Sequence, residues 1–129
     1  MSDRFVVDAH ALVWFITGSP RLGPLAKAAM EDASSSLIVP AIALAEACWL
    51  TQKGRINISS VDLVLGQISA DARFRVDPLD YDLVERCWRL GWNGEMHDQM
   101  IIATALRAKA PVLTVDTAIR GSRLVKTIW

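Results

Sequence analysis

The stretch RFVVDAHALVWFI, Arg4 to Ile16, joins a short β-rich run to an apolar helical pattern. Residues 4–7 are typical of a buried strand, and residues 9–16 predict a helix that the Thr-Gly-Ser-Pro sequence at 17–20 interrupts. Asp8 stands at the junction. A buried strand that runs directly into a helix is the beginning of a βαβ unit, so this stretch indicates a parallel sheet.

The same alternation continues to the end of the chain, without internal repeats or a Pro/Gly-rich linker. Short apolar strands between longer amphipathic helices predict an α/β fold. We expect one domain over residues 1–129, with a short central parallel sheet flanked by helices. The further predicted helices are 22–33, 41–53, 60–70, 80–90 and 98–109, and the further predicted strands are 37–39, 74–76, 112–115 and 124–128.

The 129 residues include 14 Lys and Arg and 14 Asp and Glu, so the formal net charge is zero. This balance argues against a strongly basic nucleic-acid binder. The charges are unevenly placed, however. Residues 1–106 carry nine basic and thirteen acidic residues, whereas residues 107–129 carry five basic and one acidic residue. Neutrality therefore reflects two opposing regions rather than a uniform surface.

Several classes of protein are disfavoured by composition. Two cysteines, Cys48 and Cys87, are too few for a disulfide scaffold, and both stand among apolar residues, so we expect reduced core thiols. The N-terminus lacks the basic-then-apolar pattern of a signal peptide, and no uncharged apolar run is long enough to span a membrane. We expect a cytoplasmic protein without membrane association.

Four carboxylates occupy positions that favour a site. Asp8 and Asp116 follow predicted strands, and ligands of open α/β sheets bind at the carboxyl ends of strands. Capping of the next helix is the alternative for both. Glu46 has only apolar neighbours in residues 42–50 and is expected on a core-facing stripe, where a carboxylate must be paired, protonated or metal-bound. Asp98 shares an apolar helix face too, with an N-cap role as its alternative.

Four converging carboxylates would repel one another and raise each other's pKa. One or two hard divalent cations remove that repulsion. Mg²⁺ or Mn²⁺ suits oxygen ligands, and the scarcity of His and Cys argues against Zn²⁺. Such an ion can activate water for in-line hydrolysis of a phosphodiester, so the residues predict a metal-dependent phosphate hydrolase or nuclease.

These segments resemble the PIN-domain ribonucleases, in particular the VapC-type toxins of bacterial toxin–antitoxin pairs. The first motif is similar to residues 7–14, VDAHALVW, and the second to residues 42–50 around Glu46. The third, residues 97–106 (HDQMIIATAL), is the most specific match. Residues 113–116 (LTVD) and the closing Ile128 and Trp129 resemble the end of the pattern. The likeness covers nearly the whole chain in the right order.

The resemblance implies metal-binding catalytic acids at Asp8, Glu46, Asp98 and Asp116. It implies an accessory acid at Glu95, and at Thr114 a small hydroxyl residue that supports the site. The chain departs from the family pattern before Glu46, where Ile42-Ala43-Leu44 replaces a Ser or Thr, and before Asp98, where residues 93–97 read NGEMH. The implied activity is Mg²⁺- or Mn²⁺-dependent cleavage of RNA by an endoribonuclease. The implied partners are a small cognate antitoxin and a second copy of the chain.

The remaining polar and aromatic residues allow two interpretations each. Arg120, Arg123 and Lys126 are either a solvated face or RNA-phosphate contacts. His10 is expected to pack within its helix, whereas His97, beside Asp98, is a candidate acid or ligand. Four tryptophans in apolar stripes are expected in the core or a dimer interface rather than as base-stacking platforms. They are Trp14, Trp49, Trp88 and Trp92.

The principal alternative is a catalytically silent module of the same fold that binds protein or RNA, although an intact set of four acids disfavours it. A phosphoryl-accepting receiver domain would need a Lys after a late strand, and a haloacid-dehalogenase phosphatase would need an acid in place of His10. A dinucleotide-binding fold would need a Gly-rich first turn, which residues 9–11 do not provide.

Overall fold

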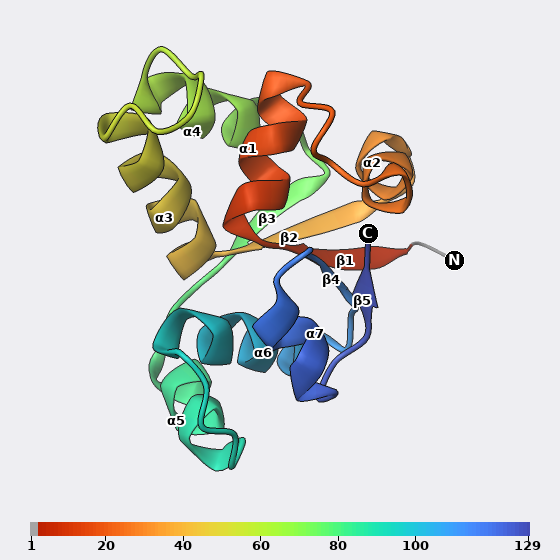
Figure 1. Cartoon of the computed structure of the whole chain (residues 1–129), viewed down its shortest axis with the longest axis vertical. Helices are drawn as coiled ribbons and strands as arrows, with labels where there is room; N and C mark the ends of the chain where they lie inside the picture. The colour runs from red at the N-terminus through yellow and green to blue at the C-terminus, as the bar shows by residue number, and fades with distance from the viewer. Residues whose placement is uncertain (1–2) are drawn as a thin grey trace.

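The computed structural model describes residues 3–129, so Met1 and Ser2 of the predicted domain lie outside the described residues. Strands and helices alternate along the chain (Figure 1). The strands are β1 (Arg4–Val7), β2 (Ser36–Pro40), β3 (Phe74–Asp77), β4 (Val112–Leu113) and β5 (Thr127–Ile128). The helices are α1 (Ala9–Thr17), α2 (Pro24–Glu31), α3 (Ala41–Gln52), α4 (Val61–Ala70), α5 (Tyr81–Arg89), α6 (Met96–Ala108) and α7 (Thr117–Ser122).

The five strands form one sheet in the order β3-β2-β1-β4-β5, and all four pairings are parallel. The predicted α/β class is therefore confirmed. Helices α1–α4 lie on one side of the sheet and α5–α7 on the other (Figure 1). Alternation along β1 supplies both cores, since Val7 packs with α1–α4 and Val6 packs with α6 and α7. Helix α5 lies outside α6, where Leu83 and Cys87 contact Ala103.

The order of the strands creates a switch point. The chain passes from β1 through β2 to β3 on one side of β1, and then returns to place β4 on the other side. Connections therefore leave β1 and β4 in opposite directions, which opens a crevice beyond their carboxyl ends. Asp8 directly follows β1, and Asp116 lies three residues after Leu113, the last residue of β4.

The predicted elements differ from the observed ones mainly at their ends. Strand β4 is two residues long rather than four, because the backbone turns at Thr114 toward a helix that the sequence did not predict. That helix, α7, has six residues, too few to produce a helical pattern. Helix α6 begins at Met96 rather than at residue 98, because Glu95 caps it. Within residues 3–129, no helix combines the length and apolar character that crossing a bilayer requires.

Candidate active site

Asp8 and Asp116 each begin a helix at the switch point. The Asp8 carboxylate accepts a 2.8 Å hydrogen bond from the Ala11 amide, and Asp116 accepts bonds from the amides of Ala118 and Ile119. The capping alternative is thus correct for both residues. It does not exclude a site role, because each carboxylate has a second oxygen beyond the one that caps.

Thr114 lies between these two acids. Its buried hydroxyl accepts a 3.0 Å hydrogen bond from the Asp116 amide and also interacts with the Asp8 carboxylate. Burial raises the pKa of Asp8 above its ordinary value, while the Thr114 hydroxyl and the Ala11 amide oppose that rise. Thr114 therefore connects the residues that follow β1 and β4.

Glu46 lies on a stripe of α3 that faces a pocket. Ile42, Ala45 and Trp49 line the same pocket at the helical spacings i−4, i−1 and i+3. The Glu46 side chain retains 27% of its exposure, and Trp49 retains 45%. The expectation that this stripe faces the core is therefore correct for Leu50, which is buried, and for Ile42, which packs against the core. It is wrong for Glu46 and Trp49, which lie at the edge where α3 meets the open crevice.

The first turn of α6 supplies the opposite wall. Glu95 is the N-cap and accepts a hydrogen bond from the His97 amide, so the capping role considered for Asp98 belongs to Glu95. The imidazole Nδ1 of His97 lies 3.7 Å from a carboxylate oxygen of Glu46 and 3.7 Å from one of Glu95. His97 therefore bridges α3 and α6 across the pocket, whereas His10 is exposed and packs against the Trp14 ring.

The pocket between these walls has a volume of about 690 Å³. Acids from three separate parts of the chain open into it, namely Glu46, Glu95, Asp98 and Asp116. Asp8 is only 6% exposed and does not line the pocket, but its pKa is raised by the charge of Asp116. The tertiary structure thus brings all four predicted acids and Glu95 to the switch point.

The acids at this pocket repel one another. Asp98 has its pKa raised to about 6, first by burial and then by the charges of Asp116, Glu95 and Glu46. Among residues 3–129, no Lys or Arg forms an ion pair with any of the four predicted acids. Their basic neighbours are two imidazoles, that of His97 beside Glu46 and Asp98 and that of His10 beside Asp8. The negative charge is therefore left without a permanent counter-ion from the chain.

The arrangement of these carboxylates limits which divalent cation they could hold. In the part of the chain that the structure describes, no three His, Cys, Asp or Glu side chains gather closely enough to form a ready metal cage. A closed structural Zn²⁺ site does not fit this arrangement. Mg²⁺ fits it better, because that ion keeps several waters and is commonly held by one or two carboxylates together with substrate phosphates.

Other residues singled out in the sequence do not line the acidic pocket. Arg120, Arg123 and Lys126 are exposed, but none lines the acidic pocket. Cys87 is buried as expected, while Cys48 is only half-buried.

Sequence reasoning missed the pocket wall formed by Ile42, Ala45 and Trp49, although their helical spacing from Glu46 carries that signal.

A parallel α/β domain with an acidic pocket at its switch point is the class that the fold and site define. The PIN domain family model matches residues 5–121. The chain belongs to the PIN domain family. No curated protein matches the sequence significantly.

Solved structures with the same fold include three toxin–antitoxin proteins, all with low sequence identity. VapC20 from Mycobacterium tuberculosis, described as a toxin that cleaves the sarcin-ricin loop, is 15% identical with a TM-score of 0.73, covering 95% of this chain and 97% of that one. VapBC2 from Rickettsia felis, bound to a promoter DNA fragment, is 12% identical with a TM-score of 0.67 and 97% coverage of both chains. A toxin–antitoxin complex from Klebsiella pneumoniae is 18% identical with a TM-score of 0.67, covering 96% of this chain and 95% of that one.

Proposed function

We propose that this PIN-domain protein is a metal-dependent endoribonuclease and the toxin component of a type II toxin–antitoxin pair. The observation that carries the proposal is the set of acids from β1, α3, α6 and the β4–α7 connection, which meet at the switch point without a Lys or Arg partner among residues 3–129. Maintaining such repulsion lowers stability, so the arrangement favours a function that uses negative charge.

Asp8, Glu46, Asp98 and Asp116 would hold Mg²⁺ or Mn²⁺, with Glu95 as an accessory acid. The bound ion would supply an activated water and stabilise charge on the phosphate. Thr114 positions Asp8 and Asp116 through its hydroxyl. His97 contacts Glu46 and Glu95 and so restricts where those carboxylates point. No side chain is needed as a covalent nucleophile in this scheme.

Basic residues outside the pocket would contact the RNA backbone. Arg120, Arg123 and Lys126 are exposed and form no ion pair within residues 3–129, so their charges are available to phosphates. A bound divalent ion would also offset the charge of the acidic pocket. We therefore propose that metal improves RNA binding as well as enabling cleavage.

The proposed partners follow from the toxin assignment. Structures of the same fold include toxin–antitoxin complexes, which supports a small cognate antitoxin as a partner of this chain. We also propose a homodimer in the cytoplasm. A catalytically silent binding module remains the competing function, since the fold alone does not require chemistry.

Cleavage of RNA with Mn²⁺ or Mg²⁺, and with EDTA, tests the proposal. The wild-type protein is compared with Asp8→Asn and Asp98→Asn, because asparagine preserves shape and the helix-capping oxygen while removing charge. Asp62→Asn is the matched control, an exposed aspartate in the first turn of α4. Metal-dependent cleavage that both site variants lose and Asp62→Asn retains is the expected result. Equal activity of all four proteins would falsify the catalytic assignment and favour the silent module.

A further inference from the structure

Trp49 is an exposed tryptophan that lines the acidic pocket. Its side chain is 45% exposed, although Trp14 and Trp92 are partly buried against the two cores. Trp49 lies one helical turn after Glu46, which corresponds to a rise of about 4.5 Å along the axis of α3. The indole of Trp49 is therefore close enough to Glu46, one of the proposed catalytic acids, for a single nucleotide to contact both.

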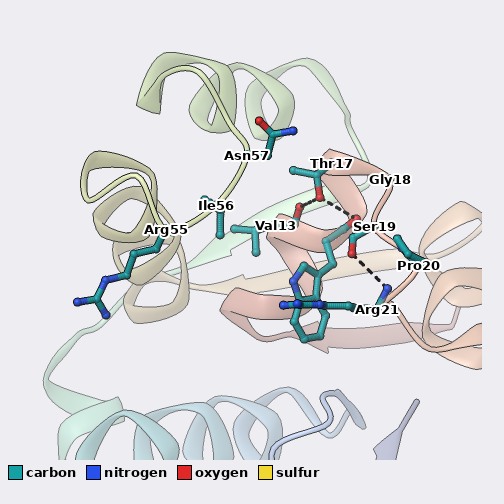
Figure 2. A pocket seen from close by; sticks show the side chains of 10 residues that line it. Val13, Thr17, Gly18, Ser19, Pro20, Arg21, Arg55, Ile56 and Asn57 are labelled. Carbon is teal, nitrogen blue, oxygen red and sulfur yellow. Dashed lines mark hydrogen bonds between the residues drawn. The ribbon is translucent and has the colours of Figure 1, made fainter.

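A cation is fixed over the same indole. The guanidinium carbon of Arg55 lies 5.2 Å from the centre of the Trp49 ring, which is a cation–π geometry. Within residues 3–129 Arg55 has no ion pair with a carboxylate, so its charge remains available to a ligand. Figure 2 shows that the Arg55 side chain extends outward from the neighbouring pocket, on the opposite side from Arg21.

The end of α3 holds Arg55 in this place. The Arg55 amide donates to the Leu50 carbonyl at 3.0 Å, and the Gly54 amide donates to the Thr51 carbonyl at 3.1 Å. These are the two hydrogen bonds of a Schellman motif, and Gly54 adopts the φ of 66° that the motif requires. The backbone therefore returns over the last turn and places the guanidinium against Trp49, instead of leaving it on a free loop.

We propose that Trp49 and Arg55 form a stacking platform for an unpaired base of single-stranded RNA, next to the phosphate at the acidic pocket. The inference rests on the proposed ribonuclease function and assigns two residues of this chain to the binding of its RNA substrate. An exposed indole binds any base face, and a guanidinium above it adds a cation for the adjoining phosphate. A paired base cannot lie flat on the ring, so the platform selects single-stranded segments and loops.

RNA explains this surface better than an apolar protein segment does. Carboxylates and an imidazole stand across the same pocket, and an apolar anchor would have to desolvate them. A nucleotide instead offers an aromatic face to Trp49 and an anionic phosphate to Arg55. A nucleotide can therefore bind the exposed indole of Trp49 and the charged Arg55 beside it at the same time.

The test measures both RNA cleavage and RNA binding by the full chain. Wild-type protein is compared with Trp49→Ala, with the aromatic rescue Trp49→Phe, and with the control Trp88→Ala, which removes an 83% exposed tryptophan from α5. The probe is a mixed-sequence single-stranded RNA oligonucleotide, free or annealed to its complement. Thermal melts verify that each variant folds, as expected for exposed side chains.

Trp49→Ala is expected to raise KM and the dissociation constant for the single strand by about 5-fold to 150-fold. The value of kcat should stay within about threefold, because the platform binds the ground and transition states alike. Trp49→Phe should restore most of the affinity, and Trp88→Ala should leave both constants unchanged. In a scan of single abasic nucleotides, one position should weaken wild-type binding while leaving Trp49→Ala binding unaffected.

The two proposals fail in different ways. A wild-type protein that does not cleave RNA with either metal, yet binds the oligonucleotide through Trp49, refutes the ribonuclease and retains the platform. A wild-type protein that cleaves, with Trp49→Ala indistinguishable from Trp88→Ala, refutes the platform alone. Failure of the wild type to bind single-stranded RNA in saturating Mg²⁺ refutes the platform.

Discussion

Replacing Asp98 by Asn should stabilise the metal-free protein at neutral pH. Neighbouring carboxylates and burial raise the pKa of Asp98 from the ordinary value of 3.8 to about 6. At about 1.4 kcal/mol for each pKa unit, this change corresponds to a destabilisation of at most about 3 kcal/mol when the carboxyl is ionised. Because Asp98 is only half-buried, solvent screening reduces the figure to about 1–2 kcal/mol.

The variant also loses a favourable interaction. Asp98 lies in the first turn of α6, where a negative charge near the helix N-terminus contributes about 0.3–1 kcal/mol. The expected net gain of Asp98→Asn is therefore about 1 kcal/mol. For a domain of this length, that gain raises Tm by roughly 3–5 °C.

The gain should depend on pH in a defined direction. An acid whose pKa is higher in the folded state destabilises the fold once the group ionises, so its penalty is absent below about pH 4 and complete above about pH 6. Melts in EDTA should therefore separate variant and wild type at about pH 7.5 and bring them together toward about pH 4.5.

Asp62→Asn provides the control for this experiment, because Asp62 is a first-turn aspartate outside the acidic pocket. It should lose a few tenths of a kcal/mol rather than gain stability. A loss of stability in Asp98→Asn at neutral pH, or a gain that persists unchanged at acidic pH, would show that repulsion and burial of the Asp98 charge do not destabilise the folded protein.

Two further predictions concern the divalent cation and the ion pairs of Arg107. Mg²⁺ or Mn²⁺ at one hundred times its Kd should stabilise the folded wild type by about 2.7 kcal/mol. Calorimetry should show no such gain in stability for Asp98→Asn. Equal gains in the two proteins would contradict metal binding at the acidic pocket. Arg107 donates to Asp77, Asp80 and Asp82 and is only 18% exposed, so Arg107→Met should cost about 2–4 kcal/mol in urea unfolding. Arg86→Met, which breaks an exposed pair with Asp82, should cost less than about 1 kcal/mol. Similar losses of stability in the two variants would contradict the larger contribution expected of the less exposed Arg107.

The sequence alone was sufficient to predict the α/β fold class and to single out the candidate acids along the chain. Runs such as Val6-Val7 and Leu37-Ile38-Val39 are typical of strands covered on both sides, and the helices between them have apolar stripes. These signals are local, so they survive without knowledge of the tertiary structure. Short elements carry weaker signals, and α7 was missed for that reason.

The candidate acids show which features could be predicted from the sequence and which required the tertiary structure. Local pattern identified Asp8 and Asp116 at strand ends, and the parallel order of β1 and β4 then places those ends side by side. Local pattern also found Glu46 among apolar residues, but it assigned that stripe to the core. A helical stripe looks the same in sequence whether it faces a packed neighbour or the edge of a crevice.

What the sequence by itself determined was a parallel α/β domain, together with the positions of its candidate acids along the chain. Only the tertiary structure decided that Glu46 and Trp49 face an open pocket, that His97 spans two of the acids, and that Arg55 lies on the indole. The physical reason is distance along the chain. Periodicity and capping act within a few residues, whereas repulsion between acids and access of solvent depend on which segments the sheet brings together.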